Sequence, residues 1–156
     1  VQETLHASFG ERAAASPMLQ KMVEKGWLGK KAGIGFYLHR GSSLTWNHQV
    51  KSMIKAPSRR MSSVEIISAL LDPMVDEAAR CLEEKVVQDA GILDLAIVMG
   101  TGYPPHLGGP LRAADAEGLP AIEKRLRAAH EAGSARSPCG LLVELASKGA
   151  GFHSVK

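Results

Sequence analysis

The sequence predicts an all-α protein, and three observations support this prediction. Apolar residues recur at three- and four-residue steps across residues 62–86, which is the period of a helix with one apolar face. Residues 17–26 and 120–132 show the same pattern over shorter stretches. Serine or proline stands near the start of each stretch, as is common at helix N-termini.

The composition favours one ordinary domain, or a small domain plus part of another. Of the 156 residues, 45% are hydrophobic, which is enough to form a core. The formal net charge is +3 and only 4% of the residues are aromatic, so nucleic-acid binding is a poor candidate. No apolar run approaches the roughly 18 residues of a membrane-spanning helix. Cys81 and Cys139 suit reduced thiols of an intracellular protein better than a disulfide scaffold.

The first part of the chain is expected to contain a short helix and a glycine-rich loop. Ser16 can act as the N-cap of a helix over residues 17–26, with Pro17 in its first turn and Gly26 at its end. Residues 29–37 are punctuated by glycines and lead into a brief apolar run that we expect to be extended.

A linker is expected to divide the chain. Residues 42–61 have weak periodicity and several helix-breaking residues, which predicts a linker with at most one short helix near residues 46–54. This linker separates residues 1–41 from a second unit over residues 62–156.

The second unit is expected to be helical throughout. Ser62 or Ser63 can cap the long helix, and Glu65 supplies an acidic first turn. Pro73 lies inside this helix and is expected to kink it or split it in two. Its charged side chains alternate in sign as on a solvated face, namely those of Asp72, Asp76, Glu77, Arg80, Glu83, Glu84 and Lys85. Further helices are expected at about 93–99, at 120–132 and from Ser137-Pro138 to about Gly149.

Residues 100–110 are expected to form a rigid loop with a specified path. Glycine permits positive φ, while proline fixes φ and lacks an N–H donor. The missing donors and the preceding helix argue against phosphate binding, and neither this loop nor residues 29–37 fits the Gly-x-Gly-x-x-Gly motif of dinucleotide sites. The residues that shape the loop are Gly100, Gly102, Pro104, Pro105, Gly108, Gly109 and Pro110.

The residue types taken alone predict no catalytic residue and no metal ligand. The six histidines have no second histidine or cysteine at metal-ligand spacing. His106 stands in the rigid loop, but the sequence identifies no carboxylate partner for it. There is also no Gly-x-Ser-x-Gly segment and no recognisable Cys/His pair.

Three stretches together carry a family resemblance. Residues 29–37 read Gly-Lys-Lys-Ala-Gly-Ile-Gly-Phe-Tyr, residues 74–84 read Met-Val-Asp-Glu-Ala-Ala-Arg-Cys-Leu-Glu-Glu, and residues 100–110 read Gly-Thr-Gly-Tyr-Pro-Pro-His-Leu-Gly-Gly-Pro. They resemble Gly-(Arg/Lys)-Lys-(Ser/Thr)-Gly-(Lys/Arg)-Gly-Phe-Tyr, Met-x-Asn-Glu-Ala-x-Arg-x-Leu-Glu-Glu and Gly-x-Gly-Phe-Pro-Pro-Phe-x-Gly-Gly-Pro. These are motifs of the 3-hydroxyacyl-CoA dehydrogenases, and more narrowly of the α-subunits of multifunctional fatty-acid oxidation enzymes.

The chain departs from the family pattern at five positions. Ala32 and Ile34 replace a hydroxyl and a base, which weakens the expectation that their loop contacts substrate. Asp76 stands where Asn is usual, and Tyr103 and His106 stand where Phe is usual.

The resemblance implies a helical C-terminal domain preceded by a truncated copy of the same domain. Residues 1–41 would be the remnant of the first copy and residues 62–156 the second. The NAD-binding Rossmann domain of the parent enzyme, with its catalytic His–Glu pair, and any enoyl-CoA hydratase module would lie upstream of Val1. The fragment alone is therefore expected to bind no cofactor and to be inactive.

The resemblance also suggests partners for the chain. They are the upstream Rossmann domain, the acyl-CoA substrate of the parent, a second copy of the chain and a thiolase subunit. Lys30 and Lys31 would lie toward the phosphates of acyl-CoA. Because Ser154-Val-Lys156 does not match the Ser-Lys-Leu peroxisomal signal, a bacterial cytoplasm is expected, with the mitochondrial matrix as the alternative.

Two other interpretations stay open at this point. In the first interpretation, the chain is a free-standing helical protein-interaction module that uses residues 100–110 to bind a partner. In the second interpretation, it is a complete small enzyme with His106 and a nearby carboxylate as its catalytic groups.

Overall fold

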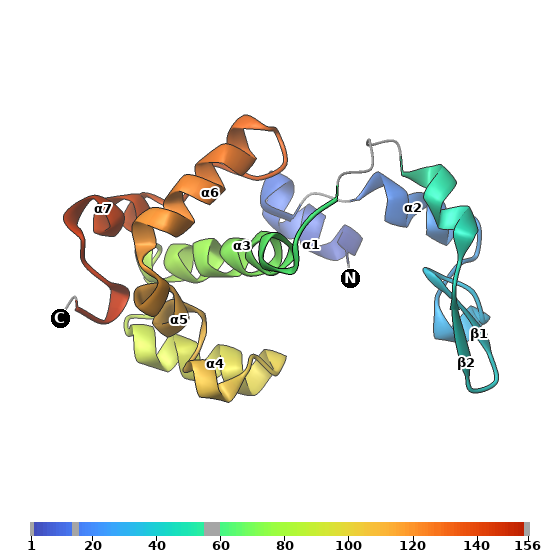
Figure 1. Ribbon diagram of the computed structural model, residues 1–156, viewed down its shortest axis with the longest axis horizontal. Coiled ribbons are helices and arrows are strands. Elements are labelled where there is room, and N and C mark those ends of the chain that lie inside the picture. The colour runs from blue at the N-terminus through green and yellow to red at the C-terminus, as the bar shows by residue number, and fades with distance from the viewer. Residues whose placement is uncertain (1, 14–15, 55–59, 155–156) are drawn as a thin grey trace. The chain divides into compact units, whose positions relative to one another are not determined.

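The computed structural model describes residues 2–13, 16–54 and 60–154. The chain divides into two compact units, unit 1 over residues 1–59 and unit 2 over residues 60–156. Helices dominate the described residues, so the all-α prediction is confirmed (Figure 1). The predicted division into residues 1–41, 42–61 and 62–156 stays a prediction.

Unit 1 combines short helices with a two-stranded sheet. The helix predicted over residues 17–26 is confirmed as α2, although the Ser16 side chain makes no capping hydrogen bond. The short helix predicted near residues 46–54 is the 3₁₀-helix η3. The elements in chain order are α1 (Gln2–Phe9), η1 (Gly10–Ala13), α2 (Pro17–Glu24), η2 (Lys30–Ala32), β1 (Tyr37–Arg40), β2 (Ser43–Trp46) and η3 (His48–Met53).

The antiparallel hairpin of β1 and β2 was not predicted. Its strands pair from Tyr37–Trp46 at one end to Arg40–Ser43 at the other. Gly41 has φ 60° whereas Ser42 keeps a negative φ, the pattern of a two-residue type II′ turn. The strands are mostly exposed, so they lack the apolar alternation by which a strand is recognised in sequence. The run that was expected to be extended after the glycine-rich loop is β1, whereas β2 lies within the predicted linker.

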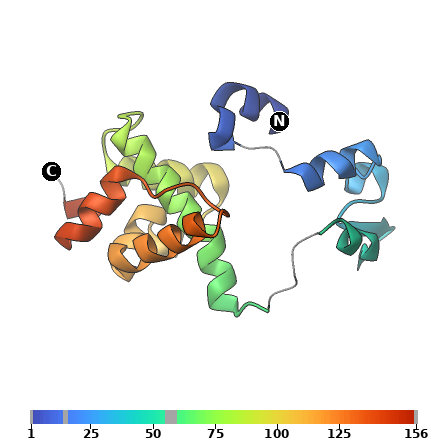
Figure 2. The ribbon, with the colours of Figure 1, turned by 90° about the horizontal axis from the view of Figure 1, so that it is seen from above.

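Unit 2 is built around the long helix α3. In Figures 1 and 2, α3 runs through this unit, and it packs against α5, α6 and α7, while α4 packs against α5. The elements are α3 (Ser63–Glu83), α4 (Ala90–Thr101), η4 (Pro105–Leu107), α5 (Pro110–Glu117), α6 (Leu119–Glu131), α7 (Gly140–Lys148) and η5 (Phe152–Ser154). No helix among the described residues is long and apolar enough to cross a membrane.

The core of unit 2 lies between α3, α5, α6 and α7. Its fully buried large side chains are Leu111, Leu119, Ile122, Cys139 and Leu142. Leu111 belongs to α5, a helix that the sequence did not predict because it is only eight residues long and directly follows the glycine–proline segment. This short helix is nevertheless central to the packing of the unit.

Helix α3 begins and continues largely as predicted. Ser62 and Glu65 form a capping box, with reciprocal hydrogen bonds between each side chain and the other residue's backbone N–H. Pro73 lies inside α3 but does not split it. The solvated-face prediction is wrong for Asp72 and Asp76, which are buried. Asp72 accepts two hydrogen bonds from Arg125 of α6, at 2.7 and 2.9 Å, so a partner from another helix stabilises its charge.

Helix α3 ends in a left-handed turn at Lys85. This residue has φ 58°, an unusual value for a side chain with a Cβ atom. The N–H of Val86 donates to the carbonyl of Cys81 at 2.9 Å, and the N–H of Lys85 donates to the carbonyl of Leu82 at 3.0 Å. These two bonds form a Schellman motif, in which glycine usually occupies the position of Lys85.

We expect Lys85→Gly to stabilise unit 2. The left-handed conformation destabilises a residue other than glycine by about 1–2 kcal/mol, and the greater unfolded-state entropy of glycine offsets part of the gain, which leaves about 0.5–1 kcal/mol. Urea denaturation followed by far-ultraviolet circular dichroism measures this change. Lys85→Ala is the control because it removes the same side chain but keeps Cβ, and an equal gain in both variants would contradict the prediction.

Candidate functional site

The predicted substrate-proximal lysines lie on a small exposed loop of unit 1. Lys30 and Lys31 belong to η2, and both are exposed. An isolated antiparallel bridge joins Gly29 to Ile34 and closes the loop, with the Gly29 N–H donating to the Ile34 carbonyl at 2.9 Å. The two lysines therefore lie at the tip of a tight turn, and their contact with substrate stays a prediction.

The glycine–proline segment connects three elements of unit 2. Its first residues, from Gly100 to Thr101, belong to α4 rather than to a loop, and Gly102 ends that helix with φ 74°. Pro105 begins η4, and Pro110 occupies the first turn of α5. Pro104 precedes η4, and Gly108 and Gly109 both have positive φ.

Tyr103 differs from its neighbours in this segment by its burial. Its side chain is buried, in contrast to the exposed residues around it. Burial, together with the nearby negative charge of Asp94, raises the pKa of Tyr103 above its ordinary value. The phenol therefore stays neutral over the physiological pH range.

A carboxylate of α4 holds the first turn of α5. Asp94 is buried, and its oxygens accept hydrogen bonds from the backbone N–H groups of Leu111 at 2.8 Å and Arg112 at 2.9 Å. Gly109, the residue at the N-cap of α5, offers no capping side chain. A Cβ atom at Gly109 would overlap the Asp94 side chain. The bare glycine thus lets Asp94 approach and act as the cap of a neighbouring helix.

A second carboxylate holds the last described turn of the chain. Asp115 of α5 accepts hydrogen bonds from the backbone N–H groups of Phe152 at 2.8 Å and His153 at 3.1 Å. The ring Nδ1 of His153 lies 2.8 Å from the same carboxylate. Its Nε2 lies 3.2 Å from Asp94 but makes no hydrogen bond with it. His153 therefore sits between the carboxylates that hold α5 and η5.

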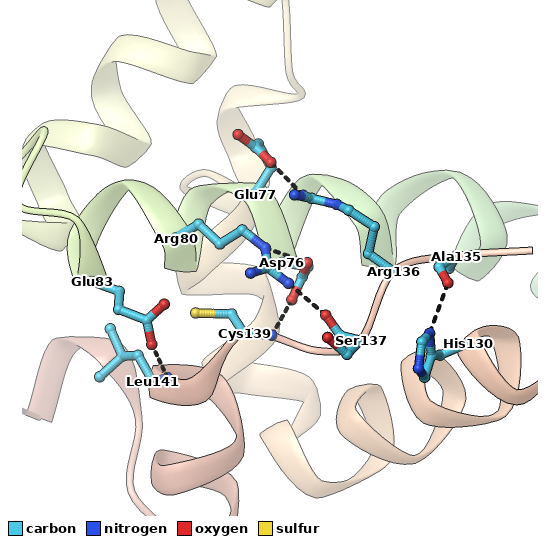
Figure 3. Close-up of polar contacts among 10 residues, drawn as sticks. All are labelled: Asp76, Glu77, Arg80, Glu83, His130, Ala135, Arg136, Ser137, Cys139 and Leu141. Atoms are coloured by element: carbon cyan, nitrogen blue, oxygen red, sulfur yellow. Dashed lines mark hydrogen bonds and ion pairs between the residues drawn. The ribbon is translucent and has the colours of Figure 1, made fainter. Parts of the chain in front are cut away.

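Carboxylates of α3 hold the start of α7 in the same way (Figure 3). Asp76 accepts from the backbone N–H of Cys139 at 2.6 Å, and Glu83 accepts from that of Leu141 at 2.9 Å. Cys139, the N-cap residue of α7, makes no side-chain capping bond. Asp76 thus does for α7 what Asp94 does for α5, which explains why this carboxylate is buried.

Arginines strengthen the connection between α3 and the segment before α7. Arg80 donates from Nε to Asp76 at 3.1 Å and from a second nitrogen to the carbonyl of Ser137 (Figure 3). Arg136 donates to Glu77 at 2.8 Å. Together these contacts hold residues 136–139, which lead into α7.

Cys139 is expected to be protected from thiol reagents. Its side chain is fully buried, and burial raises its pKa, so the reactive thiolate is disfavoured in the folded chain. Because the folded thiol keeps its proton, the free energy of unfolding should fall as pH rises above the ordinary thiol value of about 8.5.

Labelling with iodoacetamide measures this protection. In Cys81→Ala, where Cys139 is the remaining thiol, we expect slow modification that becomes fast in urea. In Cys139→Ala, the partly exposed Cys81 should react faster without denaturant. Equal native rates in the two variants would contradict the prediction.

The carboxylate cluster of unit 2 is a structural feature rather than a set of free catalytic groups. The oxygens of Asp94 and Asp115 already accept hydrogen bonds from backbone N–H groups. Among the described residues, no group of three or more His, Cys, Asp or Glu side chains is placed to hold a metal ion. His106 is exposed in η4, and its side chain makes no hydrogen bond or ion pair with the part of the chain that the structure describes.

In the sequence, His106 stands out as part of the glycine–proline segment, whereas nothing indicates that His153 lies beside carboxylates. The carboxylate neighbours of His153 lie 38 and 59 positions earlier in the chain, and no local motif connects them. Only the packing of η5 against α4 and α5 brings the three side chains together.

Comparison with known protein families first relates the N-terminal residues of the chain to a known domain. Residues 1–39 match the C-terminal domain of the 3-hydroxyacyl-CoA dehydrogenases. The helical fold of the described residues agrees with a domain of this class.

Individual proteins extend this similarity to almost the whole chain. The chain is 34% identical to the fatty acid oxidation complex subunit alpha of Idiomarina loihiensis over 98% of its own length. The corresponding values are 30% over 98% for the subunit of Vibrio vulnificus and 31% over 93% for that of Vibrio parahaemolyticus. The chain covers 22%, 22% and 21% of these three proteins, respectively. The chain is thus similar to the C-terminal part of fatty acid oxidation α-subunits, and the predicted resemblance is confirmed.

Proposed function

We propose that the chain is the helical C-terminal portion of an NAD-dependent 3-hydroxyacyl-CoA dehydrogenase of fatty acid β-oxidation. The parent enzyme would oxidise 3-hydroxyacyl-CoA to 3-ketoacyl-CoA, with NAD bound by a Rossmann domain. The similarity of almost the whole chain to fatty acid oxidation α-subunits is the observation that carries this proposal. Since the chain spans about a fifth of those relatives, the activity is assigned to the parent.

In this proposal the chain supports acyl-CoA binding and the packing of domains or subunits. Large apolar side chains on α3 and α4 lie exposed, and an apolar surface of this kind is typical of packing interfaces. The most exposed of them are Val64, Leu70, Ile92, Leu95 and Met99. Lys30 and Lys31 supply exposed cations for the phosphates of acyl-CoA. The bacterial relatives favour a bacterial cytoplasm as the location, and a thiolase subunit is a further proposed partner.

An activity assay tests whether the dehydrogenase activity belongs to the full-length protein and not to this chain alone. NADH formation from 3-hydroxyacyl-CoA is measured with this chain alone and with the full-length protein that carries it. Turnover is expected from the full-length protein and not from the chain alone. Turnover by the chain alone that disappears in His106→Ala would overturn the proposal and support the small-enzyme interpretation.

The gene sequence upstream of the codon for Val1 is an independent test. A Gly-x-Gly-x-x-Gly segment between a strand and a helix, followed by a helix with an Asn-Arg pair, is expected there. Their absence would favour a free-standing helical interaction module.

A further inference from the structure

A hollow of about 490 Å³ lies between α4 and the segment that leads into α5, and it is called the α4 hollow below. Its volume is within the range of about 300–1,000 Å³ that is usual for small-molecule sites. The hollow belongs to unit 2 alone, where α4 packs against α5 (Figure 1). Four apolar residues form much of its wall, namely Leu95, Val98, Met99 and Pro105.

The apolar wall of the hollow is open to solvent. Leu95 and Met99 are 62% and 79% exposed, and because they are four positions apart they share one face of α4. Asp94, the single charged residue of α4, is buried, so the exposed face of this helix carries no charged side chain. An apolar ligand in the hollow would remove these side chains from water, which is favourable.

An exposed cation borders the same hollow. Arg112 of α5 is exposed, and its side chain makes no ion pair or hydrogen bond with the part of the chain that the structure describes. A Cβ atom at Gly108 would lie 2.9 Å from Arg112 Cγ, so the bare glycine lets the arginine stem lie against the segment before α5. The guanidinium group is therefore available to bind a carboxylate through two parallel hydrogen bonds.

The negative charge in the wall is already engaged inside the protein. Asp94 is 2% exposed, and its oxygens accept hydrogen bonds from two backbone N–H groups at the start of α5. His153 also borders the hollow, with its Nε2 3.2 Å from Asp94. A neighbouring hollow of about 410 Å³ shares Arg112, but the exposed Asp89 borders it and would repel an anion. The α4 hollow is therefore better suited to an anionic group.

We infer that the α4 hollow binds a small carboxylate with an apolar tail. The tail contacts the apolar wall, and the carboxylate accepts hydrogen bonds from Arg112. This site is distinct from the packing surface proposed above, because a packing partner requires only an apolar surface, whereas Arg112 favours an anion. The inference does not depend on the dehydrogenase activity of the parent.

Octanoate and octylammonium are suitable probes because they have tails of the same length and opposite charges at neutral pH. Isothermal titration calorimetry of this chain is expected to show saturable binding of octanoate, with a dissociation constant on the order of 1 mM. Octylammonium should bind at least about fivefold more weakly, because Arg112 repels it. In a chain with ¹³C-labelled methionine methyl groups, the Met99 signal, identified by its loss in Met99→Leu, should shift as octanoate saturates the site.

Matched variants locate the site. Arg112→Gln is expected to raise the dissociation constant for octanoate about fivefold to tenfold and to remove most of the preference over octylammonium. The variant keeps the backbone N–H that residue 112 donates to Asp94, and circular dichroism checks that it folds. Lys124→Gln removes the same charge from an exposed position of α6 and should leave the constant unchanged. Met99→Gln should weaken the binding of both probes, because it replaces an apolar contact of the tail.

Three results would each overturn the inference. They are no saturable binding of octanoate up to about 20 mM, which is roughly twentyfold above the expected constant, equal binding of octylammonium, and an unchanged constant in Arg112→Gln. Sedimentation equilibrium examines a second copy of the chain as the alternative occupant. A dimer that dissociates in Met99→Gln, together with no octanoate binding, would identify an interface between copies and reject the carboxylate site.

Discussion

Gly109→Ala is expected to lower the free energy of unfolding of unit 2 by about 4–6 kcal/mol. Gly109 has φ 108° and ψ 168°, a region that residues with Cβ almost never adopt, and this strain accounts for about 1–3 kcal/mol. The added methyl would also overlap Asp94 near its backbone, where the side chain has little freedom to move. Moving Asp94 weakens its hydrogen bonds to Leu111 and Arg112. Thermal and urea denaturation followed by circular dichroism measure the loss, since both tryptophans lie in unit 1.

Gly118→Ala separates the two causes of this destabilisation. Gly118 has φ 100°, close to that of Gly109, but a Cβ atom there would meet nothing within 4 Å. This variant is therefore expected to show the backbone strain alone, about 1–3 kcal/mol. Equal destabilisation by the two substitutions would refute the role given to the Gly109–Asp94 contact.

Asp94→Ala is expected to destabilise unit 2 by about 3–5 kcal/mol. The substitution removes a buried charge that accepts from two backbone N–H groups of α5 and lies beside His153. The two N–H groups then lose their partners inside the protein. Asp89→Ala is a suitable control because Asp89 caps its own helix, α4, from a more exposed position, so about 1 kcal/mol is expected.

The two large substitutions should also be non-additive. The Asp94→Ala variant already lacks the carboxylate side chain that the added methyl of Gly109→Ala would overlap. The double variant is therefore expected to lose less stability than the sum of the single losses, by about 1–3 kcal/mol. Additive losses would show that Gly109 and Asp94 act independently.

The helices that the sequence predicted correctly are those with local signals. Residues 62–86 show apolar periodicity, and Ser62, one of the two serines expected to cap this helix, forms a capping box with Glu65. The helix predicted at 93–99 is also present, although α4 extends from Ala90 to Thr101. Apolar periodicity and helix-capping residues depend only on neighbours along the chain, so they can be recognised in the sequence before the tertiary structure is known.

The features that the sequence did not predict depend on tertiary contacts. The local sequence places Asp76 on a solvated face, because its burial depends on a hydrogen bond from the Cys139 N–H, 63 positions later in the chain. His153 has no local signal at all, because Asp94 and Asp115 reach it through packing. The unequal numbers of basic and acidic residues in the two units can be counted from the sequence only once the boundary between the units is known.

The carboxylates that cap neighbouring helices have a consequence for how unit 2 folds. The first N–H groups of α5 and α7 and those of η5 find acceptors on Asp94, Asp76 and Asp115, which lie 17 to 63 residues from the groups they bind. Short helices without local caps are marginal in isolation. Peptides spanning α5 or α7 alone should therefore be largely unstructured in water. These helices then form only as the chain docks onto α3 and α4, so unit 2 should fold and unfold as a single cooperative body.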